Sequence, residues 1–402
     1  LTATEFNNIT GGTLTIGSRT AGPIVNSSAI DRTNATLGTN LTLISGGSIT
    51  QTGAGNLVIS GAANFVSSGS GSSGNIILNN ATNNFGTVAA CGTNITLVDP
   101  DALTLNTITG NGTVSITAQN LTMLSTVNAT LGGSVILTPT SGVTVDLGTA
   151  SSGNFGLTPA NINNITGGTL TIGSSVGGPV VSSANIDRTN ATLGTNLTLV
   201  SGGSIMQSGG NLAISGTANF SPGASSNITF NNLANQFSGS IIATGNVVSI
   251  AGTSGLNISS VTSNDLTLNT SSGNISQTGR ILVSNVNTTY LTAVNGNIIL
   301  NNTTNDFVGG IYANATNDIQ LYNSNATILG NISSTNFQMV SAGGGITQVS
   351  GTNIVVSGLS NLTASGNSIT VNQTTNDFGT VQASGTNLTI AESNNITLNN
   401  TS

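Results

Sequence analysis

The chain has 402 residues with a formal net charge of -7, and only 4% of its residues are charged. Four Arg, with no Lys or His, cannot neutralise a track of phosphates, so nucleic acid is excluded as a partner. No apolar run approaches the roughly 18 residues that a membrane span requires, which excludes membrane insertion. Disorder is also disfavoured, because the net charge is low and β-branched residues are abundant.

Short strands are predicted along the whole chain, and no segment is predicted to be helical. Val, Ile and Leu alternate with Thr and Ser, which favours strands with one face inward, while Gly, Asn and Ser favour the turns between them. The clearest examples are Leu41–Leu43, Leu57–Ile59, Ile76–Leu78 and Val114–Thr117.

A long duplication occupies the first part of the chain. The segment Asn7–Ser18 (NNITGGTLTIGS) recurs unchanged at Asn163–Ser174, and Ile30–Leu43 (IDRTNATLGTNLTL) recurs unchanged at Ile186–Leu199. Both copies are displaced by 156 positions, so the duplicated stretches run approximately over 1–156 and 157–310. The incomplete strand at Asn395–Leu398 predicts a segment of a longer array.

A shorter period is marked by one Gln and one Phe in each module. From the second copy onward both markers step by 70 and then 71 positions, and two markers that keep one spacing indicate a structural module. The markers are Gln51, Gln207, Gln277 and Gln348, with Phe85, Phe237, Phe307 and Phe378.

These repeats predict an all-β fold, a parallel β-solenoid forming one continuous array over 1–402. A module of about 70 residues would hold about three coils of roughly 23 residues, a usual solenoid repeat length. About 17 coils stacked at the strand spacing would form a single elongated rod on the order of 80 Å long. The Phe markers are expected to fill the core at one corner of each module.

Two strings resemble the β-strand repeats of filamentous-haemagglutinin-type exoproteins, a class that includes two-partner-secretion adhesins and autotransporter passengers. They are GNIILNNATNNFGTVAACGTNITL (Gly74–Leu97) and GNSITVNQTTNDFGTVQASGTNLTI (Gly366–Ile390). The resemblance implies a right-handed parallel β-helix that is exported and displayed at or beyond a bacterial cell surface. The family's Asn-Pro-Asn-Gly type secretion motif is absent, so export is inferred from the resemblance alone.

Candidate catalytic residues are few, and we expect no enzyme, cofactor or metal site. The nearest carboxylate pair, Asp99 and Asp101, flanks Pro100 and is read as a solvated turn. Asp31–Arg32, repeated in the second copy, is read as a surface or inter-coil ion pair with a ligand role as the alternative. Cys91 is expected to be a small buried hydrophobic residue.

Two further clusters leave alternatives open. Asn305–Asp306 and Asn376–Asp377 precede a marker Phe and would suit calcium, but stacked Asn ladders explain them better. The three tyrosines, Tyr290, Tyr312 and Tyr322, could form an outward glycan platform, although filling at coil corners is favoured.

The sequence therefore predicts an extracellular, non-enzymatic structural and adhesive protein, a surface stalk or fibre segment. Its expected partners are copies of itself or glycans and surface receptors. A self-assembling filament subunit is the alternative, because uncapped solenoid ends can stack head to tail. A glycan- or ice-binding module and a polysaccharide-active enzyme are the weaker alternatives.

Overall fold

The computed structural model describes residues 2–6, 8–69, 72–149, 153–286 and 288–399, and the chain folds into two compact units. Unit 1 comprises Leu1–Gly203 with Ser208–Gly210, and unit 2 comprises Ser204–Gln207 with Asn211–Ser402. Each unit is a parallel β-solenoid, and about 16 turns are present against the 17 expected. The predicted all-β fold is therefore confirmed.

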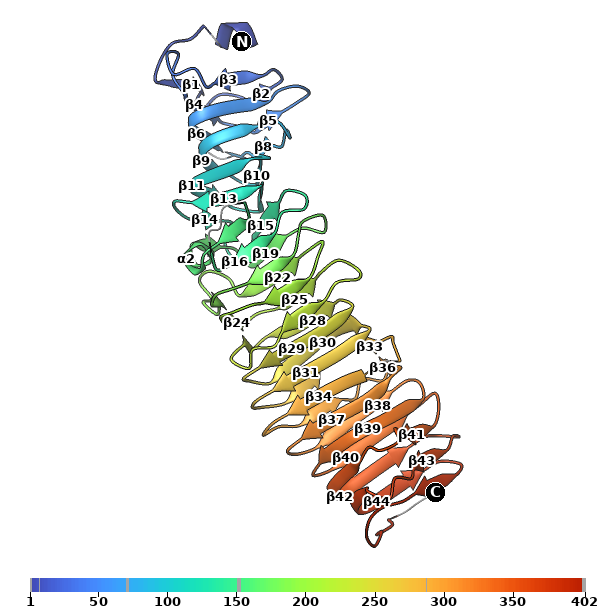
Figure 1. Cartoon of the computed structure of the whole chain (residues 1–402). Helices are drawn as coiled ribbons and strands as arrows, with labels where there is room; N and C mark the ends of the chain where they lie inside the picture. The colour runs from blue at the N-terminus through green and yellow to red at the C-terminus, as the bar shows by residue number, and fades with distance from the viewer. Residues whose placement is uncertain (1, 7, 70–71, 150–152, 287, 400–402) are drawn as a thin grey trace. The chain divides into compact units, whose positions relative to one another are not determined.

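Unit 1, blue to green in Figure 1, contains the two short helices and the first strands. Its elements are α1 (Ala3–Phe6), β1 (Thr13–Gly17), β2 (Ile24–Asn26), β3 (Ile30–Arg32), β4 (Asn40–Ser45), β5 (Ile49–Gln51), β6 (Leu57–Gly69), β7 (Ser72–Ser73), β8 (Ile76–Leu78), β9 (Asn84–Gly92), β10 (Ile95–Val98), β11 (Ala102–Gly110), β12 (Val114–Ala118), β13 (Asn120–Met123), β14 (Val127–Asn128), β15 (Ser134–Pro139), β16 (Val145–Leu147), β17 (Phe155–Leu157), α2 (Pro159–Asn163), β18 (Ile165–Thr166), β19 (Thr169–Gly173), β20 (Val180–Ser182), β21 (Ile186–Arg188) and β22 (Asn196–Val200).

The regular elements among the described residues of unit 2 are all strands, and they are drawn from green to red in Figure 1. They are β23 (Ile205–Gln207), β24 (Leu212–Ile214), β25 (Ala218–Ser221), β26 (Ile228–Phe230), β27 (Gln236–Phe237), β28 (Ser240–Thr244), β29 (Val247–Gly252), β30 (Leu256–Ser263), β31 (Asp265–Thr270), β32 (Ile275–Gln277), β33 (Ile281–Val283), β34 (Thr288–Ala293), β35 (Ile298–Leu300), β36 (Asp306–Phe307), β37 (Gly310–Ala315), β38 (Ile319–Asn323), β39 (Thr327–Ser334), β40 (Phe337–Ser341), β41 (Ile346–Gln348), β42 (Ile354–Thr363), β43 (Ile369–Val371), β44 (Asp377–Ser384) and β45 (Leu388–Ile390).

Strands of successive turns pair in parallel and in register, so that like side chains form columns. In unit 1, β10, β12, β15, β19 and β22 pair in sequence and place inward residues directly above one another. Burial of each such side chain contributes roughly 1.5–3 kcal/mol. One fully buried column consists of Leu97, Ile116, Leu137, Ile172 and Leu199.

Unit 2 repeats the same arrangement. Strands β26, β29, β31, β34 and β37 pair in sequence. Their inward column is Phe230, Ile250, Leu268, Leu291 and Ala313, and the outward column beside it is Thr229, Ser249, Thr267, Tyr290 and Tyr312.

The expectation that no segment is helical is wrong at two places. Helix α2 is initiated by Thr158, whose hydroxyl accepts from the backbone of Asn161 while the Asn161 side chain accepts from the backbone of Thr158. Pro159 at the first helical position supports this start, because its fixed φ suits a helix. At the equivalent place in the first copy, Thr2 and Glu5 make the same reciprocal contacts before α1.

Candidate functional site: a buried amide clamp in each module

A reciprocal pair of side-chain amides links neighbouring turns in each module, and we call this pair the amide clamp. Each clamp joins the marker Gln to the Asn two positions before the marker Phe. In the third module, Gln277 Nε2 donates to Asn305 Oδ1 at 2.8 Å, and Asn305 Nδ2 donates to Gln277 Oε1 at 2.7 Å. The other three clamps are Gln51–Asn83, Gln207–Asn235 and Gln348–Asn376.

The Asn of the clamp is fully buried and also binds the backbone. Asn305 Oδ1 accepts from the N–H of Ile281 at 3.0 Å, and its Nδ2 donates to the carbonyl of Leu300 at 3.1 Å. Each of the other three clamp Asn residues makes the same two kinds of backbone contact. The clamp therefore satisfies polar groups that would otherwise be buried without partners, at a turn where the strand ladder is interrupted.

The marker Phe lies beside the clamp and fills the core. Phe85, Phe237, Phe307 and Phe378 are at most 4% exposed. In the first module the rings of Phe65 and Phe85 meet edge to face with centroids 5.8 Å apart, an arrangement that the quadrupoles of the rings favour.

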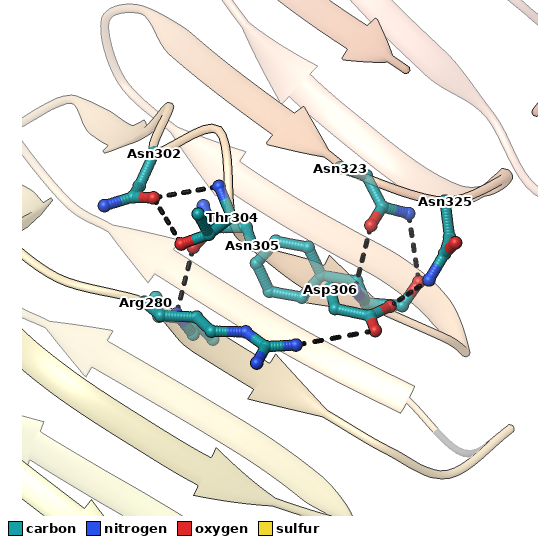
Figure 2. Close-up of polar contacts among 9 residues, drawn as sticks. Arg280, Asn302, Thr304, Asn305, Asp306, Asn323 and Asn325 are labelled. Atoms are coloured by element: carbon teal, nitrogen blue, oxygen red, sulfur yellow. Dashed lines mark hydrogen bonds and ion pairs between the residues drawn. The ribbon is translucent and has the colours of Figure 1, made fainter. Parts of the chain in front are cut away.

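A further side chain accepts a hydrogen bond from the backbone N–H of the marker Phe. Asn323 Oδ1 accepts from Phe307 at 3.0 Å, Asp99 Oδ2 accepts from Phe85 at 2.8 Å, and Glu392 Oε2 accepts from Phe378 at 2.9 Å. Figure 2 shows Asn323 beside this backbone in the third module. In these three modules the acceptor is an Asn, an Asp or a Glu side chain.

The interpretation of Asp99 as a solvated turn is wrong. Asp99 is fully buried, and its carboxylate accepts from the backbone N–H groups of Phe85 and Asp101. Burial raises the pKa of Asp99 above its ordinary 3.8, and the two backbone hydrogen bonds oppose that rise. Asp101 itself is exposed, and it accepts a hydrogen bond from Asn84.

Asp306, next to the third clamp, lies on the outside. Its carboxylate lies 3.8 Å from the guanidinium of Arg280 and accepts from Asn325 at 2.7 Å (Figure 2). The predicted Asn ladder is found instead at other positions, for example where Asn246 donates to Asn227 and Asn264 donates to Asn246. At Asn305 the partner along the stack is Gln277 rather than another Asn.

The expectation of a surface or inter-coil ion pair at Asp31–Arg32 is wrong, because the two side chains bind different groups. Arg32 is 1% exposed, and its guanidinium donates to the carbonyls of Ile9, Gly11 and Leu37. Asp31 is exposed and accepts from the backbone and hydroxyl of Thr33, which closes a local turn. A buried guanidinium is accommodated because its planar donors fit several carbonyls at once.

The second copy reproduces this guanidinium contact. Arg188 is also 1% exposed and donates to the carbonyls of Ile165, Gly167 and Leu193, each displaced by 156 positions from its counterpart. Burial lowers the pKa of Arg188 below its ordinary value, and the charge of Asp187 opposes that change. The duplication thus carries a buried guanidinium with equivalent backbone partners in both copies.

Two further predictions about single side chains are wrong. Cys91 is exposed, because it lies at an outward position of β9. Tyr290, Tyr312 and Tyr322 lie within strands β34, β37 and β38 and not at coil corners. Tyr290 and Tyr312 are direct neighbours in adjacent strands.

The amide clamp has a structural role, because side-chain amides neither titrate nor act as nucleophiles. Among the described residues, no group of three or more His, Cys, Asp or Glu side chains could hold a metal ion. In the same part of the chain, no helix has the length and apolar character needed to cross a membrane.

Fold and clamps together define a parallel β-solenoid built from sequence repeats. The chain belongs to the family described as Repeats of unknown function (DUF5649), whose model matches residues 20–91, 176–244, 244–314 and 316–385. Each matched segment contains one marker Gln and one marker Phe, and therefore one amide clamp. Comparisons with curated proteins and with solved structures found no match.

Proposed function

We propose that the chain is a non-enzymatic structural and adhesive solenoid, displayed as a stalk or fibre segment on a bacterial cell surface. The observation that carries this proposal is the repeated amide clamp. In four modules, the side-chain amides of the clamp join one turn to the next, as in Gln277–Asn305. Their role is to hold the turns together, which is the requirement of a spacer.

The outer surface supports the same role. Only 4% of the residues are charged, and the outward columns consist mainly of hydroxyl and amide side chains. Such a surface is hydrated without strong fields, so it suits a protein that presents binding regions at a distance from the cell. The resemblance of Gly74–Leu97 and Gly366–Ile390 to filamentous-haemagglutinin-type repeats supports an exported location.

Antibody labelling of intact cells of the source organism tests the location. We expect an antibody against the purified chain to label intact cells or their surroundings as strongly as permeabilised cells. Labelling that requires permeabilisation would place the protein inside the cell and overturn the proposal.

Negative-stain electron microscopy over a concentration series separates the stalk from the filament alternative. Isolated particles of constant length at every concentration are expected for a stalk segment. Unbranched fibres that lengthen with concentration would make self-assembly the primary function.

A further inference from the structure

Two stacked tyrosines form an aromatic surface on the outer face of unit 2. Tyr290 on β34 and Tyr312 on β37 are in register, and their ring centroids lie 5.0 Å apart with planes inclined by 34°. Tyr290 lies at an outward position of its strand and is 47% exposed.

The modules do not need these tyrosines to fold. The same paired position holds Asn64 and Ala89 in the first module, Asn219 and Ile242 in the second, and Asn361 and Gln382 in the fourth. Three modules thus build the same two strands without an aromatic side chain at either position. A role in filling the fold therefore does not explain the aromatic pair.

The strand that follows makes room for the second ring. A Cβ atom on Gly330 would lie 2.5 Å from the ring of Tyr312, so glycine is required for the ring to rest where it does. Gly330 lies where β39 bulges opposite Tyr312, between the paired positions Ile311–Leu329 and Ala313–Ile332. The ring position is thus set by the neighbouring turn.

Beside the rings is an open hollow of about 210 Å³, lined by Tyr290, Tyr312, Thr292, Asn314 and Asn331 among others. It combines aromatic surface with hydroxyl and amide groups, and none of its lining residues is charged. Pockets for drug-sized ligands span roughly 300–1,000 Å³, so this hollow suits one ring of a longer ligand that continues along the surface.

We propose that this surface, the tyrosine platform, binds a neutral glycan, with one pyranose ring against the tyrosines and its hydroxyls bonded to Thr292, Asn314 and Asn331. A pyranose presents an apolar C–H face and a polar rim, which match the two sides of the hollow. Uncharged lining residues and the net charge of -7 favour neutral over acidic sugars. This inference rests on the proposed adhesive function and names the class of ligand.

Binding is measured on the purified full chain with cellohexaose, chitohexaose and maltohexaose as neutral probes and hexagalacturonate as the acidic probe. The chain contains no Trp and three Tyr, all on β34, β37 or β38, so tyrosine emission reports directly on the region. Calorimetry provides a second readout that does not depend on the number of tyrosines.

The matched variants are Tyr290→Asn and Tyr312→Ile, which install the residues of the second module at the same paired position. Tyr322→Phe on β38 is the control. We expect at least one neutral hexaose to bind, each platform variant to weaken it tenfold or more, and the control to leave it unchanged. Gly330→Ala should also weaken binding, because it displaces the ring of Tyr312.

Three outcomes overturn the inference: no neutral hexaose binds, the platform variants bind as well as the parent chain, or hexagalacturonate binds equally well. None of these results depends on where the protein resides. Surface labelling of cells tests the proposed function separately, so failure of the platform and failure of surface display can be told apart.

Discussion

Gln277 and Asn305 lie 28 positions apart in the sequence and exchange two hydrogen bonds of 2.8 and 2.7 Å between their side-chain amides. The same exchange occurs in all four matched repeats, with separations of 32, 28, 28 and 28 positions. The amide clamp is therefore a polar contact that all four matched repeats share.

Replacing Asn305 by Ala should destabilise unit 2 strongly. The change removes this partner from the N–H of Ile281, the carbonyl of Leu300 and the half-buried amide of Gln277. We expect a loss of about 3–5 kcal/mol in the free energy of unfolding, from several unsatisfied groups at roughly 1–3 kcal/mol each. Urea titration followed by circular dichroism measures it.

The control for this variant is Asn301→Ala, four positions earlier on the exposed side of the same loop. That change should cost less than about 0.5 kcal/mol, as is usual for surface substitutions. Equal midpoints for the two variants would show that the clamp does not hold the turns together.

Replacing Arg188 by Met should destabilise the chain, because it removes the buried guanidinium. The carbonyls of Ile165, Gly167 and Leu193 would lose a charged donor, at about 3–5 kcal/mol in total. Lys at this position should recover only part of the loss, because an ammonium cannot reproduce the planar fork. Thermal melts of the three proteins test the order Arg, Lys, Met, and a Lys variant as stable as the parent would contradict it.

The folding stability of the Asp99→Asn variant, relative to that of the parent chain, should increase as the pH rises. The folded state raises the pKa of Asp99, so the folded chain holds its proton more tightly than the unfolded chain does. The contribution of Asp99 to stability is therefore fully present below the ordinary pKa of 3.8 and is lost as the pH rises through the folded pKa. Asn has no charge to desolvate, and Asn323 already fills this position in the third module.

The measurement for Asp99 is the difference in melting temperature between the variant and the parent from pH 3 to pH 7. The melting temperature of the Asn variant should increase relative to that of the parent chain over this range. A constant difference, or one that shrinks, would mean that the Asp99 carboxyl does not titrate as inferred.

Arg280→Ala should have little effect on stability. Its guanidinium is half exposed and lies 3.8 Å from Asp306, and such pairs contribute about 0–1 kcal/mol. Urea melts of parent and variant at low salt and in 1 M NaCl should nearly coincide. A large loss confined to low salt would identify a stronger electrostatic contribution than this geometry supports.

The sequence was sufficient to predict the parallel solenoid and the strands at Leu41–Leu43 and Val114–Thr117, because alternation and repeat length are local signals. The partner of each marker Gln could not be inferred, because a spacing of 28 positions does not tell which atoms meet. The expectation that Asp99 and Arg32 lie at the surface fails for a related reason. Charge predicts exposure on average, and only the fold shows the backbone groups that receive these side chains.

The sequence does not predict the short helix α2, because five residues carry almost no periodicity. Its one signal was Thr158 followed by Pro159, a helix start with Asn161 completing the reciprocal contacts. Cys91 was missed because its residue type is usually buried, whereas its place on β9 points outward.

The in-register pairing of neighbouring turns has a consequence for how the chain acquires its structure. Ile95 pairs with Val114 and Val114 pairs with Val135, so each strand finds its partner about 20 positions away in the sequence. Folding rates rise as contacts become more local, and here no strand of this series must wait for a distant segment. A growing or emerging chain can therefore wind turn by turn in the order in which it is released, and each amide clamp closes as soon as the turn after its Gln is in place.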